Sequence, residues 1–223
     1  MFDLDGPLMD ALRKLSDIVF YNILFCLFSL PIVTTGAALA ALCEGMQLIA
    51  EGKDTDLQVF KTFFGCFRRS FKRATELWFL SMLGTVILAS LSYAAASFSG
   101  RPLGTSYSLI YYIAAILFLV GYHNLYPTLA RWPQLSVKAC LIRTYMVAVI
   151  GLPWTLLGIM VTVAFSFVTL VLNHNIFRFG FFLWAVCGFG ILTYICSFFF
   201  LRAVSVYERK MALQGTADRE GDQ

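Results

Sequence analysis

Five long stretches without a single Asp, Glu, Lys or Arg dominate the chain. They are Ile18–Cys43, Leu77–Gly100, Pro102–Ala130, Thr144–Phe177 and Phe179–Leu201. A helix rises 1.5 Å per residue, so roughly 20 apolar residues cross a hydrocarbon core of about 30 Å. Every stretch meets that length. Only 13% of the residues are charged, against about 25% in soluble domains. The sequence therefore predicts an all-α, polytopic transmembrane helical bundle.

The positive charges indicate the orientation of that bundle, because cytoplasmic connections carry an excess of Lys and Arg. Cations cluster before Leu77, between the third and fourth stretches, and after the fifth; they are Lys53, Lys61, Arg68, Arg69, Lys72, Arg73, Arg131, Lys138, Arg143, Arg202, Arg209, Lys210 and Arg219. The two intervening gaps hold only Arg101 and Arg178. We expect a multi-pass plasma-membrane protein with a cytoplasmic C-terminus.

The first apolar region allows two topologies. Pro31 removes a helical hydrogen-bond donor and clashes with the preceding turn, and Thr34 or Thr35 could cap a new helix. The region would then be a hairpin of two short helices, giving six membrane segments with both termini inside, as Arg13 and Lys14 suggest. The alternative is one long kinked helix, which gives five segments and an outside N-terminus. The acidic start and the lack of a cleavage site indicate that this region is retained.

We expect one transmembrane domain over residues 1–213 and a polar, disordered tail over 214–223. The expected segments are 18–31, 35–50, 77–99, 106–130, 144–172 and 177–203. Pro153 marks a second helix break. Kinking is the simpler interpretation of both prolines, although interrupted helices can also mark a transporter's substrate site.

A basic amphipathic helix is expected at about residues 58–75. Five phenylalanines share one face of it: Phe60, Phe63, Phe64, Phe67 and Phe71. Cations occupy the opposite arc, and Arg68, Arg69, Lys72 and Arg73 are the candidate contacts with lipid or a partner. Such a helix lies in the membrane interface and attracts anionic lipid head groups.

Polar side chains inside the apolar segments are the other candidates, because hydrocarbon cannot solvate them. Glu44 and Gln47 share a helix face, and His123 and Asn124 lie in a later segment. These four residues could line a polar cavity open to the cytoplasm. They could equally form interhelical hydrogen bonds that hold the bundle together, as could Asn22.

Motifs of catalysis and metal binding are absent from the sequence. It has no G-x-x-x-x-G-K-[ST], G-x-S-x-G or H-E-x-x-H, and its six cysteines form neither a C-x-x-C pair nor a Cys/His ligand spacing. We therefore expect no enzymatic activity, no metal or other cofactor, and no nucleic-acid partner.

The N-terminal third resembles the YesL family of small bacterial membrane proteins, which are built on a domain of unknown function. The similarity is carried by Leu30-Pro31-Ile32-Val33-Thr34-Thr35-Gly36-Ala37, by Ala40-Ala41-Leu42 and by the phenylalanine-rich basic stretch. Cys43 stands where a tyrosine would be expected. The resemblance implies a bacterial plasma-membrane protein encoded near carbohydrate ABC transporters, glycoside hydrolases and sensor kinases.

Two hypotheses follow from these observations. The first is a non-enzymatic accessory or regulatory protein for carbohydrate uptake or utilisation, whose partner is a carbohydrate ABC transporter or a sensor kinase. The alternative is a small membrane transporter or a substrate-binding membrane subunit.

Overall fold

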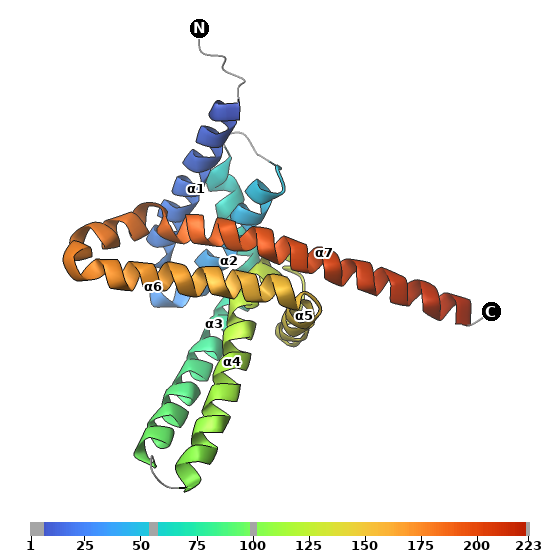
Figure 1. Ribbon diagram of the computed structural model, residues 1–223. Helices are drawn as coiled ribbons and strands as arrows, with labels where there is room; N and C mark the ends of the chain where they lie inside the picture. Colours follow the sequence, from blue (N-terminus) through green and yellow to red (C-terminus); the bar gives the residue numbers. More distant parts are fainter. Residues whose placement is uncertain (1–6, 54–57, 99–101, 222–223) are drawn as a thin grey trace.

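The computed structural model describes residues 7–53, 58–98 and 102–221, and leaves the side chains of 7–8, 102–103, 169–185 and 215–221 undescribed. The described part is helical, and no strand occurs in it (Figure 1). Its elements are α1 (Pro7–Ser29), the short 3-10 helix η1 (Ile32–Thr34), α2 (Thr35–Ala50), α3 (Val59–Ser97), α4 (Pro102–Arg131), α5 (Val137–Ile150), α6 (Leu152–Leu183), the π-helix η2 (Trp184–Gly188) and α7 (Phe189–Gly221).

Several of these helices are long and apolar enough to cross a membrane. Among the described residues four qualify: Ile32–Ala50, Val59–Ser97, Gly104–Arg131 and Val186–Gln214. Helix α5 and the first part of α6 make a fifth if they are counted as one bent span. Helix α1 does not qualify because Arg13, Lys14 and Asp17 leave it an apolar part of only residues 18–29. The all-helical, membrane-compatible fold predicted from the sequence is thus present.

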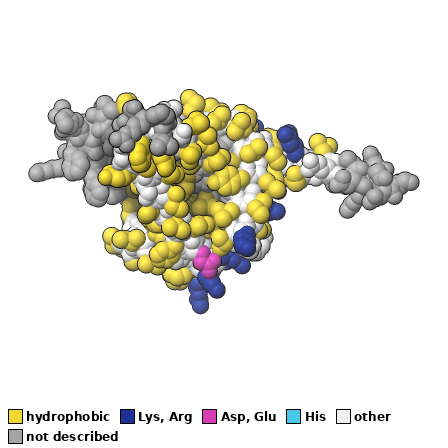
Figure 2. Space-filling view, turned by 90° about the horizontal axis from the view of Figure 1, so that it is seen from below, with side chains coloured by type: hydrophobic (Ala, Val, Ile, Leu, Met, Phe, Trp, Pro, Cys, Tyr) yellow, Lys and Arg dark blue, Asp and Glu magenta, His cyan; other side chains and the backbone are white. Residues whose placement is uncertain are grey.

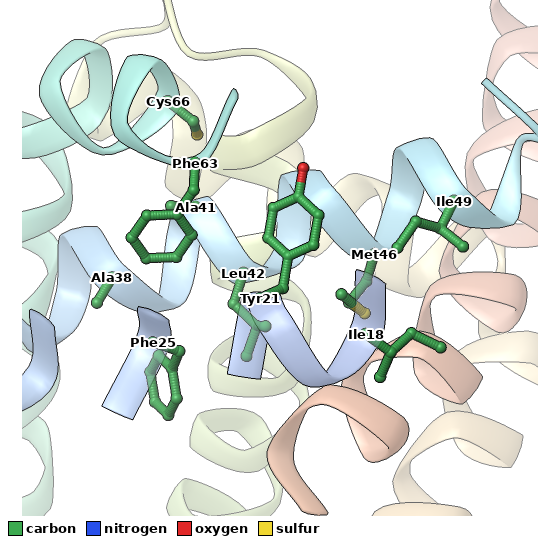
Figure 3. Close-up of a cluster of buried hydrophobic side chains, with 10 residues drawn as sticks. All are labelled: Ile18, Tyr21, Phe25, Ala38, Ala41, Leu42, Met46, Ile49, Phe63 and Cys66. Atoms are coloured by element: carbon green, nitrogen blue, oxygen red, sulfur yellow. The ribbon is translucent and has the colours of Figure 1, made fainter. Parts of the chain in front are cut away.

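Helix α2 lies at the centre of the molecule, packed against α1, α3, α4 and α7. Alanine and glycine dominate its buried face, and small residues let helix backbones approach closely. At Gly36 the backbone of α3 itself comes close, since a Cβ there would lie 2.5 Å from the carbonyl oxygen of Ala74. A hydrophobic cluster joins α2 to α1 and α3 (Figure 3); its largest fully buried side chains are Phe63, Leu42 and Met46.

The first apolar region forms two helices rather than one. Helix α1 ends at Ser29, and α2 begins at Thr35 after the extended Pro31 and the short η1. Thr34 is the N-cap residue of α2, as expected, but its side chain makes no capping hydrogen bond to α2. The Thr34 hydroxyl instead donates to the carbonyl oxygens of Phe28 (2.6 Å) and Pro31 (2.7 Å). The threonines therefore cap the end of α1.

The amphipathic segment and the following membrane segment, which we expected to be separate, form the single 39-residue helix α3. The helix is continuous through Glu76, so the basic part and the apolar part belong to one element.

The expected segment 144–172 is divided in the structure. Helix α5 ends at Ile150, and α6 leaves at an angle of 98° to it. Pro153 is the second residue of α6, where a proline costs no intrahelical hydrogen bond. Gly151 lies at the sharp turn and packs closely on α7. A Cβ at this position would lie 2.4 Å from the Cβ of Ala203, so a larger residue would push the turn away from α7.

The end of the chain also differs from expectation. Helix α6 continues past the predicted boundary at residues 172–177 to Leu183, and the expected outer connection at Arg178 falls on residues whose side chains are not described. Helix α7 runs to Gly221. Residues 214–221 of the tail expected to be disordered therefore continue the helix, because no proline interrupts it before Gly221.

Candidate functional site

Ion pairs connect the central helix to its neighbours. Arg69 on α3 places one guanidinium nitrogen 2.7 Å from both carboxylate oxygens of Glu44 on α2. Glu51, just after α2, accepts from Arg131 of α4 at 2.6 Å and from Lys53 at 2.6 Å. These contacts use charges from two of the predicted cytoplasmic connections, so part of the cationic excess is structural.

The connection between α4 and α5 is fixed by its own set of contacts. Arg73 of α3 donates to the carbonyl oxygen of Pro133. The Arg143 guanidinium lies 4.8 Å from the Trp132 ring centroid, a cation–π arrangement. Trp132 in turn meets the Tyr207 ring of α7 edge to face at 6.5 Å. Helices α3, α4, α5 and α7 are thereby joined on the side of the molecule where the cations cluster.

The four candidate cavity residues do not converge on a shared space. Glu44 pairs with Arg69, and Gln47 donates to the carbonyl oxygen of Pro127 in α4 at 3.0 Å. Asn124 is buried and donates to Val120 in its own helix at 3.0 Å. His123 points elsewhere, with its Nε2 beside Gly158 of α6. Glu44 and Gln47 thus bond to neighbouring helices, whereas Asn124 bonds within its own helix.

Asn22 makes a contact that sequence analysis could not have specified. Its Oδ1, fully buried between helices, accepts a hydrogen bond of 2.7 Å from the backbone N–H of Gly190. Gly190 is the second residue after η2, and a π-helical turn shifts the backbone hydrogen-bond pattern. A Cβ at Gly190 would lie 2.9 Å from the Ile18 carbonyl oxygen. The asparagine thus fixes the start of α7 against α1 across 168 residues of sequence.

Two of the four residues of the predicted lipid or partner surface also make contacts within the protein. Arg69 and Arg73 are engaged in this way, while Arg68, Arg69 and Lys72 are exposed. A shallow groove of about 510 Å³ lies on this part of α3, lined by Phe60, Lys61, Phe64, Gly65, Arg68 and Arg69. A Cβ at Gly65 would meet only open space. Figure 2 shows a face that is largely hydrophobic, with cations gathered along one side of it.

The phenylalanine face predicted to meet lipid is divided between two environments. Phe63 is 1% exposed and packs against Tyr21 and Phe28 of α1, with ring centroids 6.3 and 5.7 Å away. Phe60 and Phe64 remain exposed, and their rings stack in parallel at 6.2 Å. Helix α1 therefore occupies part of the surface that we assigned to the membrane.

A second groove, of about 310 Å³, lies between α3, α4 and α5 and is mainly apolar. Gly84 and Gly121 line it, and Tyr145 closes one side by donating to the Leu117 carbonyl oxygen at 3.3 Å. Within the described part of the chain, no group of three or more His, Cys, Asp or Glu side chains could hold a metal ion.

The helices and their buried contacts define a class of protein: an all-helical chain with several helices able to cross a membrane. Its residues 18–90 match a family described as a protein of unknown function, DUF624. The match covers α2, the apolar part of α1 and most of α3. No curated protein and no solved structure matches the chain.

The pKa of the Glu51 carboxyl lies below its ordinary value. Burial favours the neutral form, but the hydrogen bond from Lys53 and the positive charge of Arg131 outweigh it. A carboxyl whose pKa is lower in the folded state stabilises the fold at pH values above its unfolded pKa, about 4.3 for glutamate. This contribution is lost as the pH falls through that value and then through the folded pKa.

We therefore expect Glu51→Gln to lower thermal stability in detergent at pH 7 by a small amount, about 0.2–1 kcal/mol for a partly exposed pair. The difference from the wild type should shrink between about pH 5 and pH 3, as the wild-type carboxyl is protonated. Glu208→Gln, at an exposed position of α7, is the matched control and should leave the thermal stability at pH 7 unchanged. A Glu51→Gln difference that stays constant with pH would contradict the assignment.

Proposed function

We propose that this protein is a non-enzymatic, YesL-family component of the bacterial plasma membrane that assists or regulates carbohydrate uptake or utilisation. The phrase Leu30–Ala37 and the phenylalanine-rich helix, on which the YesL resemblance depends, both fall within the matched residues 18–90. One structural observation favours an accessory role over transport. The polar side chains that could have lined a substrate cavity are taken up in packing, as Glu44–Arg69 and Gln47–Pro127 illustrate.

The proposed topology follows the positive charges. Six membrane segments, of which α1 and α2 are the first two, place both ends of the described chain in the cytoplasm. The clusters around Arg68 and Arg131 then face the cytoplasmic leaflet, in agreement with the positive-inside rule.

The exposed cations Lys61, Arg68 and Lys72 form the contact surface in this proposal. Anionic head groups of membrane lipids are their first partners, since each cation near an anionic leaflet contributes about 1 kcal/mol. The protein partner is a carbohydrate ABC transporter or a sensor kinase, whose cytoplasmic side would meet the same surface.

A deletion strain complemented with variants tests the role. The double variant Arg68→Gln/Lys72→Gln removes exposed charge from α3, and Arg209→Gln/Lys210→Gln removes the same charge from exposed positions of α7. We expect the deletion to reduce sugar uptake or operon induction, the α3 variant to restore it poorly, and the α7 control to restore it fully. Co-purification from native membranes should recover the transporter or kinase with the wild type. Unchanged uptake and induction across a broad sugar panel would contradict the proposal.

The transporter alternative has one observation in its favour. The Nε2 of His123 in α4 lies beside Gly158 of α6. One turn further along α6, the Thr162 hydroxyl contacts the Cys196 sulfur of α7 at 3.4 Å, so polar atoms of these three helices meet within the bundle. If this cluster binds substrate, the purified protein will bind a sugar in equilibrium dialysis and His123→Leu will abolish binding. Recovery of the protein alone, with a bound small molecule, would favour this alternative.

A further inference from the structure

The turn between α1 and α2 exposes large apolar side chains. Leu30 and Ile32 are 76% and 74% exposed, and Val33 is 48% exposed. No described part of the chain covers this tip, formed by Leu30–Val33. An aqueous turn would carry polar residues at these positions, so the tip is built for an apolar environment.

Three backbone acceptors of the turn are paired within it. The carbonyl oxygens of Phe28 and Pro31 accept from the Thr34 hydroxyl, and that of Ser29 accepts from the Thr35 hydroxyl at 3.3 Å. Pro31 also accepts from the Thr34 backbone N–H at 2.9 Å. An unsatisfied carbonyl in hydrocarbon costs several kcal/mol, so irregular backbone enters that region only where its polar groups are paired. Thr34 and Thr35 supply this pairing for the carbonyls of Phe28, Ser29 and Pro31.

The depth of the tip follows from the contacts of α2 with α3. Gly36 at the start of α2 meets Ala74 and Trp78, whereas Glu44 further along meets Arg69. The tip is therefore level with the point where the basic part of α3 gives way to its apolar part. From there α3 continues about 28 Å, at 1.5 Å per residue, to Ser97. Figure 1 shows the α3–α4 hairpin extending well beyond the α1–α2 turn.

One arm of the hairpin is too short to cross the membrane. The apolar part of α1, residues 18–29, is about 18 Å long, against a hydrocarbon core of about 30 Å. The other arm, Ile32–Ala50, is long enough by itself, but a full crossing by the hairpin needs both arms. We propose that the α1–α2 hairpin enters the cytoplasmic leaflet, inserts Leu30–Val33 among the lipid acyl chains, and returns without crossing the membrane. This inference rests on the proposed cytoplasmic position of the basic residues.

Cysteine accessibility in intact cells tests the proposal. Ile32→Cys, and Leu30→Cys as a second tip position, would be treated with a membrane-impermeant maleimide from outside. Ser97→Cys is the outside control and Gln134→Cys the cytoplasmic control, both at exposed positions. The parent chain gives the background of the native cysteines. We expect external labelling of the tip below one tenth of that at Ser97. Labelling of the tip comparable to Ser97 would show a full crossing and overturn the inference.

The depth of the tip in the bilayer can be measured with the purified Ile32→Cys protein. The cysteine carries an environment-sensitive nitrobenzoxadiazole label, and the protein is reconstituted in phosphatidylcholine/phosphatidylglycerol vesicles. We expect quenching by doxyl groups on the acyl chains and little quenching by aqueous iodide. Strong iodide quenching would place the tip in water and overturn the inference. External labelling of Gln134→Cys would overturn the proposed orientation instead, so the two failures are distinguishable.

Discussion

Replacing Gly36 by alanine will destabilise the protein, whereas the same replacement at Gly65 will leave it unchanged or slightly more stable. A Cβ at Gly36 would lie 2.5 Å from the Ala74 carbonyl oxygen and 2.8 Å from the Trp78 Cβ. The first of these atoms belongs to the backbone, so α2 and α3 must separate. Forcing extra volume into a packed interface costs about 1–3 kcal/mol. At Gly65 the new methyl group meets open space, and alanine is favoured over glycine in a helix by about 0.5–1 kcal/mol.

The two variants form a matched pair because both positions lie within helices and the chemical change is identical. The measurement is the temperature at which half of the detergent-solubilised protein loses its monodisperse peak in size-exclusion chromatography. We expect this temperature to fall for Gly36→Ala and to stay or rise for Gly65→Ala. A similar shift for both would mean that helix propensity, not the contact between α2 and α3, decides the outcome.

The sequence predicted the features that depend on local chemistry. The charge-free stretches, which are long enough as helices to cross a bilayer, predicted a helical membrane protein. Pro31 predicted the break after the first helix, because proline cannot continue a helix. The periodicity of Phe60 to Phe71 identified an apolar face correctly. It could not identify what covers that face. Tyr21 and Phe28, which cover Phe63, come from a helix more than 30 residues earlier.

The candidate site was less predictable because its contacts join distant positions. Glu44 and Gln47 were recognised as a shared helix face, but their partners Arg69 and Pro127 depend on how α2 packs among α3 and α4. The same holds for Asn22, whose partner is a backbone N–H after a π-helical turn. The 98° angle between α5 and α6 likewise reflects close packing of Gly151 on Ala203 rather than Pro153 alone.

The division of the phenylalanine face leads to the second prediction. Phe63→Ala should destabilise the fold strongly, by about 3–5 kcal/mol, because removing a fully buried ring leaves a cavity between α1 and α3. Phe60→Ala, one helical turn away and 62% exposed, should change folding stability by no more than about 0.5 kcal/mol. The exposed ring can still contribute to membrane contact, since an interfacial helix is held mainly by its buried apolar area.

Two measurements on the same pair of variants separate these roles. Thermal loss of the folded fraction in detergent should shift to lower temperature for Phe63→Ala and not for Phe60→Ala. Partitioning of a synthetic peptide covering residues 58–75 into neutral vesicles should instead weaken for both, because the isolated peptide has no α1 to cover Phe63. If Phe60→Ala destabilised the full-length protein as much as Phe63→Ala, the ring at position 60 would have to be buried, and the groove beside Gly65 would be occupied by protein rather than facing the membrane.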